Sequence, residues 1–508
     1  MTAALPTTST IAVIGAGAMG AGIAQVAAVA GHRVQLLDNR PGAAADAIRS
    51  IQAQIAKMAD KGKLTPERAA QASANLVAAQ QLSDLGGASL VIEAIVENLQ
   101  AKQGLYAELE GIVGDDCIFG TNTSSISVTA IGAVLKRPQR LAGLHFFNPA
   151  PVMALVEIVS GLATDPAVAA TLFATATAWG KNAVHAKSTP GFIVNRVARP
   201  YYGEALRLLT EGAADCATLD AVMREAGGFR MGPFELMDMI GHDVNYAVTC
   251  SVWNAFYNDP RFLPSLVQKE LLDAGFLGKK SGRGFFDYRE GASKPTPQTE
   301  ATRAAPNSIT LCGDSAAAQA LAERLTKAGI PFDTTPSADG RMAQVNGAVL
   351  FVTDGRTATQ RAADTGLVNV VLVDLALDYR SATRLALASA AQCAEVAVGA
   401  AIALLQAAGL QVSRMADVPG LAVMRTVAML ANEAADAVYQ GVCSPEAADA
   451  AMRLGVNYPK GPLAWADAVG LPTIRTVLAN LGSSYGEDRY RISPLIQRHV
   501  FAGQSLHG

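Results

Sequence analysis

The sequence predicts an α/β protein in which a doubly wound sheet domain precedes an all-helical domain, with a degenerate second copy of both. Short β-branched runs alternate with helical patterns up to about residue 188, which is typical of a doubly wound sheet. Helical periodicity alone then continues over 189–290. Two motifs of that helical stretch recur later in the chain: Pro190 matches Pro419 and Pro233 matches Pro462, both at an offset of 229. A shared offset indicates an internal duplication.

The composition describes a folded chain with no bulk preference for polyanions. Half of the 508 residues are hydrophobic and 17% are charged, with a net charge of -3, so we expect neither a nucleic-acid nor a membrane partner. The six cysteines form no C-x-x-C pair, which argues against a disulfide framework or a metal site and favours a reducing compartment. The first ten residues show no signal peptide, and we therefore expect a cytoplasmic protein.

The sheet domain, residues 1–188, is expected to contain six strands. They alternate with helical segments, which predicts a parallel, doubly wound sheet. The strands are expected at Ile11–Ile14, Arg33–Leu37, Ser89–Glu93, Cys117–Asn122, Leu141–Phe146 and Leu155–Val159.

A glycine pattern follows the first strand and opens the first helix. It reads Gly15-Ala16-Gly17-Ala18-Met19-Gly20, and Asp38 ends the next strand. In this context G-x-G-x-x-G predicts a Rossmann-type dinucleotide site, in which the glycines permit the tight turn, the approach of the pyrophosphate and the packing of the helix. A carboxylate at Asp38 would accept hydrogen bonds from the ribose and repel a 2′-phosphate, which favours NAD over NADP, although Arg40 weakens that preference. The alternative is a glycine turn that serves packing only.

The second half of the chain is predicted to be a reduced repeat. Residues 291–306 are rich in Pro and Thr and are interpreted as a linker. A truncated sheet domain is expected over 307–410 and a second helical domain over 411–508. The strand that opens the repeat is followed by Cys312-Gly313-Asp314-Ser315, which lacks the glycine spacing, so we expect its nucleotide site to be lost.

Four polar residues stand at the ends of elements, where open α/β sheets bind ligands. His145 ends one predicted strand and Glu157 lies on the next; a histidine oriented by a carboxylate can act as a general base. Ser124 follows another strand, and Asn195 opens the helical domain. Taken singly, each has a structural interpretation: a core histidine, a surface charge, a helix cap and a helix-end residue.

Together, these features resemble the L-3-hydroxyacyl-CoA dehydrogenase family over residues 10–290. The motifs that carry the resemblance are VIGAGAMGAGIAQ, VIEAIVENL, TNTSSIS, GLHFFNPAPVMALVEIV, TPGFIVNR, GPFELMD and GKKSGRGFFDY. The resemblance implies that His145 is the catalytic base, that Glu157 is its partner, and that Ser124 and Asn195 bind the substrate. It also implies contacts to NAD from the glycine loop, Asp38, Glu97, Lys102, Asn148 and Lys280.

The same resemblance implies an acyl-CoA substrate and no metal. It assigns CoA contacts to Ser50 and Lys57, although a solvated helix face explains the lysine equally well. The two-copy layout is similar to that of bacterial dehydrogenases of phenylacetate degradation, which act on 3-hydroxyadipyl-CoA or 3-hydroxybutyryl-CoA. An adipyl tail ends in a carboxylate, for which Arg199, one helical turn after Asn195, is a candidate partner; structural packing of the arginine is at least as plausible.

The implied reaction is the oxidation of the C3 hydroxyl, with hydride transfer to NAD. A non-catalytic NAD-binding structural protein of the same fold, or a dehydrogenase of a non-CoA hydroxy acid, are the alternatives. The second copy is expected to be inactive. The offset of 229 places Met424 at the position of Asn195, and an alignment of Arg140-Leu141-Ala142 with Arg384-Leu385-Ala386 makes Ser389 the counterpart of His145. We expect the helical copies to form an internal pseudo-dimer, and leave a homo-oligomer of whole chains open.

Overall fold

The computed structural model describes residues 3–508, which divide into two compact units. The first unit comprises the chain up to Arg196 together with Gln440–Val456. The second comprises Val197–Tyr439 and Asn457–Gly508. A segment of the second copy therefore belongs to the unit that holds the first sheet, which no local sequence pattern indicates. Within residues 3–508, no helix is both long and apolar enough to span a bilayer.

Eight strands form the sheet of the first unit, in the order β3-β2-β1-β4-β5-β6-β7-β8. Their bounds are β1 Ile11–Ile14, β2 Val34–Leu37, β3 Leu76–Ala78, β4 Leu90–Glu93, β5 Ile118–Thr121, β6 Leu141–Phe146, β7 Leu155–Ser160 and β8 Asn182–Lys187. All neighbours are parallel except β6 and β7. The predicted all-parallel sheet is therefore wrong at this pair: only residues 147–154 connect the two strands, whereas a parallel crossover needs a dozen or more. Strands β3 and β8 are not indicated by the sequence pattern.

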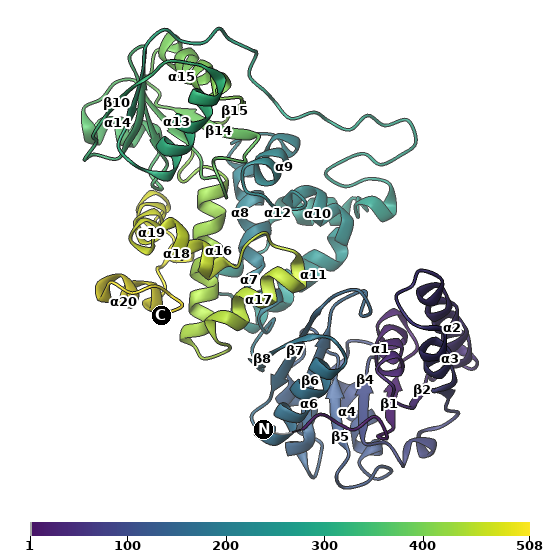
Figure 1. The fold of residues 1–508 in the computed structure, drawn as a ribbon. Coiled ribbons are helices and arrows are strands. Elements are labelled where there is room, and N and C mark those ends of the chain that lie inside the picture. Colours follow the sequence, from purple (N-terminus) through teal and green to yellow (C-terminus); the bar gives the residue numbers. More distant parts are fainter. Residues whose placement is uncertain (1–2) are drawn as a thin grey trace. The chain divides into compact units, whose positions relative to one another are not determined.

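Helices cover this sheet and bury its strands. Ile11, Val13 and Ile92 are fully buried and share one hydrophobic core with Ile23 of α1 and Ile51 of α2. Figure 1 shows α1, α2 and α3 grouped near β1 and β2, with α6 near β6. The helices of the unit are α1 Ala18–Val29, α2 Ala43–Asp60, α3 Pro66–Ala74, α4 Leu99–Leu109, α5 Val128–Gly132, α6 Pro166–Ala178 and α17 Pro445–Val456, with 3-10 turns η1 Leu82–Leu85 and η2 Pro138–Arg140.

The helical part of the second unit contains most of both helical copies, without α17. Helix α16 packs against α8, α18, α19 and α20. The short helix α7, Val194–Val197, leads into this region from the first unit. The other elements are α8 Arg199–Thr210, α9 Cys216–Glu225, α10 Pro233–Ile240, α11 His242–Ala255, α12 Leu266–Asp273, α16 Val423–Tyr439, α18 Pro462–Val469, α19 Leu471–Tyr485 and α20 Pro494–Ala502, with turns η3 Pro260–Phe262, η4 Lys279–Ser281 and η5 Asp488–Tyr490.

The second unit also holds a seven-stranded sheet, in the order β10-β9-β11-β12-β13-β14-β15. The expected truncation is confirmed, because a hairpin with Asn346 and Gly347 at its tip joins β11 to β12, where helix α4 joins β4 to β5 in the first sheet. Both tip residues have positive φ, 43° and 85°, as a two-residue hairpin turn requires. The elements are β9 Ile309–Cys312, β10 Asp333–Thr335, β11 Arg341–Val345, β12 Ala348–Val352, β13 Val370–Val373, β14 Arg384–Ser389 and β15 Gln411–Arg414, with helices α13 Ala316–Ala328, α14 Ala358–Thr365 and α15 Glu395–Ala407.

The last strands of the two sheets correspond position by position. Leu155 of β7 pairs with Asn182 of β8, and Arg384 of β14 pairs with Gln411 of β15. The offset between the matching positions of these two pairs is again 229, the offset of the helical motifs. Strand β14 is therefore the counterpart of β7, and β13 is that of β6.

This correspondence corrects one prediction. His145 lies opposite Glu157 on the neighbouring strand. At the same repeat offset, Asp374 corresponds to His145 and Ala386 to Glu157, and Asp374 donates its backbone N–H to Ala386. The counterpart of His145 is thus Asp374 and not Ser389. The three-residue similarity at Arg384 is misleading because it aligns the start of β14 with the start of β6.

Candidate active site

The glycine loop between β1 and α1 forms one wall of a cavity of about 810 Å³. Gly15 has φ +102°, and a side chain on it would collide with the backbone of Ala94. A side chain on Gly20 would collide with the carbonyl of Gly15, whereas the Cβ direction of Gly17 meets nothing within 4 Å. The loop therefore needs Gly15 and Gly20 for its own packing, and Gly17 leaves room for a phosphate to approach the backbone.

Asp38 lines the same cavity at the end of β2. Its Oδ2 accepts the N–H of Ala16 at 2.7 Å, and its Oδ1 accepts the backbone N–H and the Nε of Arg40 at 2.9 and 3.0 Å. The Arg40 guanidinium, together with these N–H donors, lowers the pKa of Asp38 to about 2. The carboxylate is therefore ionised at neutral pH, as discrimination against a 2′-phosphate requires.

A second cluster of charges joins β4 to the loop after β5. The buried ammonium of Lys102 lies 2.6 Å from Glu93 and 3.3 Å from Glu97. Glu97 Oε1 accepts the hydroxyl of Thr123 at 2.6 Å and the backbone N–H groups of Ser124 and Ser125 at 3.0 and 3.1 Å. Burial opposes ionisation of Glu97, but these donors and Lys102 together hold its pKa below the usual value. The cluster thus fixes the loop that carries Ser124.

His145 and Glu157 form a buried pair on the antiparallel strands β6 and β7. They lie directly opposite each other, and Nδ1 of His145 is 2.6 Å from Oε2 of Glu157. The other carboxylate oxygen accepts the backbone N–H groups of Ile193 and Val194 at 3.1 and 3.0 Å. A proton on Nδ1 satisfies Glu157, which leaves Nε2 as the basic nitrogen.

Asn195 is connected to the same site. It follows Val194, and its Nδ2 lies 3.4 Å from the backbone oxygen of Ser124. The structure thus brings the four predicted residues into one chain of contacts within the first unit, from Ser124 through Asn195 and the start of α7 to Glu157 and His145. Aromatic rings enclose the histidine: the centroids of Phe147 and Phe192 lie 4.5 and 5.8 Å from that of His145.

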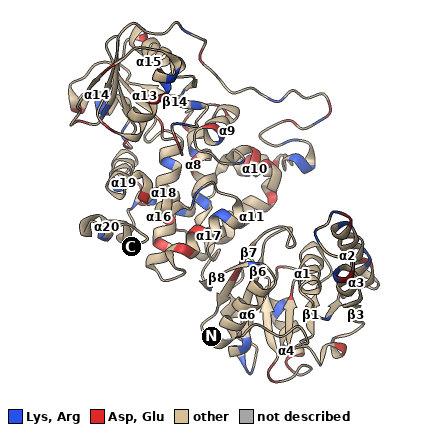
Figure 2. Cartoon of the chain, in the orientation of Figure 1, with Lys and Arg blue, Asp and Glu red and all other residues tan. Residues whose placement is uncertain are grey.

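The other predicted contact residues of the first unit are accessible. Asn148, just beyond β6, is exposed. Ser50 and Lys57 occupy the exposed face of α2, opposite the buried Ile51 and Ile55. Lys57 lies near the end of that helix with Lys61 and Lys63, and Figure 2 shows positive charge there.

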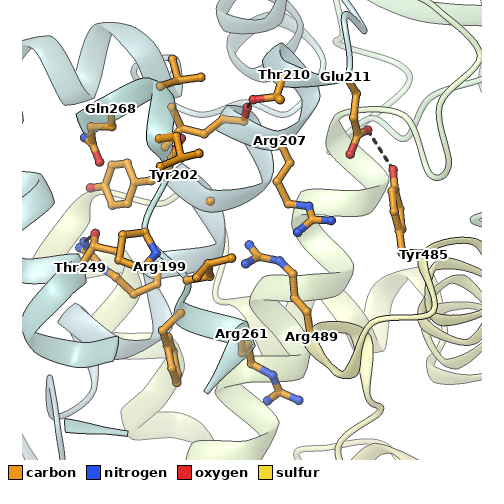
Figure 3. A pocket seen from close by; sticks show the side chains of 18 residues that line it. Arg199, Tyr202, Arg207, Thr210, Glu211, Thr249, Arg261, Gln268, Tyr485 and Arg489 are labelled. Carbon is orange, nitrogen blue, oxygen red and sulfur yellow. Dashed lines mark hydrogen bonds between the residues drawn. The ribbon is translucent and has the colours of Figure 1, made fainter. Parts of the chain in front are cut away.

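Lys280 and Arg199 belong to the second unit. The ammonium of Lys280 lies 2.5 Å from the carboxylate of Asp243. Arg199 lines a cavity of about 470 Å³ in which Tyr202, Arg207 and Arg489 also take part (Figure 3). Its guanidinium donates to Thr249 at 3.0 Å and lies 4.8 Å from the centre of the Tyr202 ring. Burial lowers the pKa of Arg199.

The remaining charges of this cavity are compensated. Arg207 forms two hydrogen bonds to Glu487 at 2.9 and 2.7 Å, and Arg489 lies 2.8 Å from Glu204. Apolar groups supply much of the other lining: Leu206, Phe262, Leu263, Pro264, Leu266 and Val267. The cavity therefore suits an apolar chain.

Sequence reasoning missed several residues that support the site. Thr123 and Ser125 bind Glu97, and Phe147 packs on His145. The motifs TNTSSIS and GLHFFNPAP contain all three, so their position beside predicted residues is the signal that could have identified them. No such signal exists for Gln440–Val456, because the residues that this segment contacts in the first unit are remote from it in the sequence.

Family models match most of the chain. The 3-hydroxyacyl-CoA dehydrogenase NAD binding domain matches residues 10–189, and the C-terminal domain of 3-hydroxyacyl-CoA dehydrogenase matches twice, at 191–288 and 420–506. The reduced Rossmann-fold domain of 3-hydroxybutyryl-CoA dehydrogenase matches residues 350–419.

Known proteins match either the whole chain or its first half. The 3-hydroxyadipyl-CoA dehydrogenase of Escherichia coli K12 is 46% identical over 97% of both chains. A crystal structure of 3-hydroxybutyryl-CoA dehydrogenase from E. coli K12 has a TM-score of 0.89 and 44% identity, and the match covers 98% of this chain and 99% of that one. A probable 3-hydroxybutyryl-CoA dehydrogenase of Bacillus subtilis is 41% identical over 56% of this chain and 98% of its own. The two-copy length is therefore shared with the E. coli proteins.

Proposed function

Because this chain belongs to the 3-hydroxyacyl-CoA dehydrogenase family, we propose that it oxidises 3-hydroxyadipyl-CoA or 3-hydroxybutyryl-CoA with His145 as the general base. The chain is an NAD-dependent 3-hydroxyacyl-CoA dehydrogenase. The choice between the two acyl groups is supported by the names of its relatives: the one of equal length is named for 3-hydroxyadipyl-CoA, and shorter ones are named for 3-hydroxybutyryl-CoA.

The observation that carries the proposed mechanism is the 2.6 Å contact between His145 and Glu157. Glu157 is itself held by two backbone N–H groups at the start of α7, so it orients the imidazole with Nε2 available to the substrate. As Nε2 takes the proton of the C3 hydroxyl, the buried carboxylate stabilises the imidazolium that forms. Bound NAD supplies the acceptor for the hydride that leaves C3.

Ser124 and Asn195 are proposed to hold the substrate oxygens. Both are half-buried, and they are in contact through the Ser124 carbonyl. Hydrogen bonds from a hydroxyl and an amide align C3 and stabilise charge on the oxygen without a metal. CoA is proposed to bind along the exposed face of α2 through Ser50 and Lys57.

NAD is proposed to bind in the cavity at the glycine loop. Its pyrophosphate would approach Gly17 at the N-terminus of α1, where backbone N–H groups favour an anion. Asp38 would accept the ribose hydroxyls, and Glu97, Lys102 and Asn148 would line the path toward His145. Lys280 is proposed as a further contact.

We also propose that the two helical copies form an internal pseudo-dimer. Helices α8 and α16, which correspond in the repeat, pack on each other. Glu204 binds Arg489 of the second copy at 2.8 Å, and Glu433, the repeat counterpart of Glu204, binds Arg261 of the first copy at 3.1 Å. Such reciprocal pairs are what a two-fold relation produces. A homo-oligomer of whole chains stays a prediction of the sequence.

We place the reaction in the cytoplasm. All six cysteines lie within the described residues, and each is a free thiol, which suits a reducing compartment.

A spectrophotometric assay tests the proposed function. The full chain with NAD is expected to form NADH from both 3-hydroxyacyl-CoA thioesters and not from free 3-hydroxybutyrate. His145→Gln is the matched control, because glutamine can still bind Glu157 but cannot accept the proton. If neither thioester reacts, and acetoacetyl-CoA does not oxidise NADH, the non-catalytic alternative replaces the proposal.

A further inference from the structure

A segment of the catalytically degenerate copy packs on the strand that carries Glu157. Helix α17 contacts β7 and β8 of the first sheet. Two hydrogen bonds connect the segment that precedes α17 to the first copy: Lys187 donates its backbone N–H to Val442 at 2.9 Å, and the buried Arg196 donates to the side chain of Gln440 at 2.9 Å. All of these residues belong to the first unit.

Gly455 is the point of closest approach. A Cβ on this helical glycine would lie 2.7 Å from Leu155 Cδ2, 3.1 Å from Val194 Cγ2 and 3.7 Å from Phe147 Cε1. The first two distances are shorter than ordinary carbon contacts. Gly455 is the next-to-last residue of α17, and the close approach gives a physical reason for a residue without a side chain there.

Each neighbour of Gly455 adjoins one of the groups proposed for catalysis. Leu155 lies on β7, two residues before Glu157. Val194 donates its N–H to Glu157 and precedes Asn195. Phe147 packs its ring against His145, with centroids 4.5 Å apart. One turn of α17 thus touches the supports of the base, its carboxylate partner and the substrate-binding amide.

The same relation exists in the second sheet, where no catalytic group depends on it. Helix α9 of the first copy packs on β14, and Ala416 donates its backbone N–H to Ala213 at 2.9 Å. This hydrogen bond is the repeat counterpart of that between Lys187 and Val442. Ala226 occupies the position that corresponds to Gly455, so only the helix on the catalytic sheet has the smaller residue.

Charge also allows α17 to stay close to Glu157. Cys443, at the approach to α17, lies close enough to Glu157 to sense its charge, together with those of Arg196 and Asp449. Burial, assisted by the Glu157 carboxylate, raises the pKa of the Cys443 thiol to about 12. The thiol is therefore neutral and adds no negative charge beside Glu157.

We propose that α17 of the second copy is a positioning element of the first copy's active site, with Gly455 as the residue that lets Phe147 and Val194 hold His145 and Asn195 in place. The inference rests on the catalytic roles proposed above for His145, Glu157 and Asn195. It gives the second copy a part in the reaction without any chemistry of its own.

Kinetics of the full-length Gly455→Val variant test this inference. Displaced reacting groups cost roughly tenfold to a hundredfold in rate, so kcat should fall by that amount. The Kd for NADH should stay within about twofold, because the glycine loop is not touched. The acid limb of the profile of kcat/KM against pH should shift, because the packing around the His145–Glu157 pair changes.

A matched glycine and a compensating substitution separate positioning from folding. Gly104 is an exposed glycine in α4 of the same unit, with nothing within 4 Å of its Cβ direction, so Gly104→Val should keep kcat and the pH profile. Leu155→Ala removes the three carbons that Gly455→Val adds, and the double variant should regain most of the lost kcat. If Gly455→Val does not fold, Gly455→Ala is measured instead, with the same readouts.

Wild-type kcat and an unshifted pH profile in folded Gly455→Val would overturn the inference, and so would a loss that Leu155→Ala does not recover. His145→Ala is measured beside these variants to keep the two proposals distinguishable. An active His145→Ala would overturn the proposed function, whereas an inactive one beside a fully active Gly455→Val would overturn only the role of α17.

Discussion

One position of the repeat carries His145 in the first sheet and Asp374 in the second. In both sheets a buried carboxylate accepts the N–H groups at the start of a helix, but the carboxylate belongs to different positions of the repeat. In the first sheet, His145 binds Glu157, and Glu157 accepts the N–H groups of Ile193 and Val194. In the second, Asp374 itself accepts the N–H groups that begin the corresponding helix. The donors are Ala422, Val423 and Met424.

The contrast shows what the duplication kept and what it lost. A buried carboxylate at the start of the helix satisfies N–H groups that have no partner within the helix, and both copies retain it. The imidazole between strand and carboxylate is present only in the first copy, and Ala386 stands where the second copy would need a glutamate. The start of the helix thus needs only the carboxylate in both copies, whereas the histidine serves the catalytic role proposed for the first copy.

The second sheet also lacks the features that form the nucleotide site of the first sheet. Gly15, Gly17 and Gly20 open α1, whereas Ser315 caps α13 through its hydroxyl. The second sheet replaces helix α4, which carries Lys102, with a two-residue hairpin, so β11 runs in the opposite direction to β4 relative to its neighbours. A strand of reversed direction does not bring its carboxyl end to the edge at which such sheets bind nucleotides.

The largest expected effect is the difference in kcat between substitutions of His145 and of Asp374. His145→Ala should lower kcat roughly 10²–10⁴-fold, the usual contribution of a positioned proton-transfer group, with little change in NADH affinity. Asp374→Ala should leave kcat of the folded protein unchanged. Steady-state assays of both variants at matched folded fractions measure this, and near wild-type turnover of His145→Ala would remove the assigned base.

The second effect is on stability and depends on pH. Burial raises the pKa of Asp374 to about 6, above the value of roughly 4 in an unfolded chain. Such a carboxyl contributes stability that is fully present below the unfolded pKa and is lost as the pH rises through 6. The unfolding free energy of wild type relative to Asp374→Asn should therefore fall by about 2 kcal/mol between pH 4 and pH 7.5.

Urea unfolding at several pH values measures that difference. Burial raises the pKa of Asp220 to about 7 as well, but this residue is present in both chains and its contribution cancels. If the unfolding free energies of wild type and Asp374→Asn change with pH in parallel, Asp374 does not titrate in this range.

A third prediction concerns the preference for NAD. Asp38→Ala should reduce the NAD-to-NADP ratio of kcat/KM by about tenfold, because a charged hydrogen bond to the ribose and repulsion of a 2′-phosphate are both lost. Initial rates with each cofactor measure the ratio. An unchanged ratio would show that residues other than Asp38 discriminate between the two cofactors.

The number of NAD molecules bound per chain tests whether the second sheet has lost its cofactor site. Calorimetric titration of the intact chain with NAD should give one site, since the second sheet has neither the glycine loop nor a counterpart of α4. A stoichiometry of two would contradict the loss of the second site.

The smallest expected effect concerns Arg199 and its cavity in the second unit. Arg199→Met keeps much of the stem and removes the fork-shaped donor, so it should reduce kcat/KM for 3-hydroxyadipyl-CoA by about tenfold more than for 3-hydroxybutyryl-CoA. Parallel assays with the two thioesters test this. Equal losses would mean that the arginine acts through packing, as its contacts with Thr249 and Tyr202 also allow.

Much of the first copy was determined by local sequence. The spacing of Gly15, Gly17 and Gly20 predicts a tight glycine turn, and the structure has that turn, in which Gly15 and Gly20 leave no room for a side chain. The motif at His145 and the one at Glu157 place both residues on neighbouring strands, and an offset of 229 identifies the repeat. These features are readable because each depends on a few residues close together in the chain.

Tertiary structure alone decided the rest, because it depends on residues that are distant in sequence. The antiparallel direction of β7 makes His145 face Glu157, and only the pairing of β13 with β14 identifies Asp374 as the counterpart of His145. The packing of α17 on β7 brings Gly455 next to Val194, although the two residues are far apart in the sequence. No local pattern encodes such a contact, since it depends on the packing of surfaces whose residues are remote from each other in the sequence.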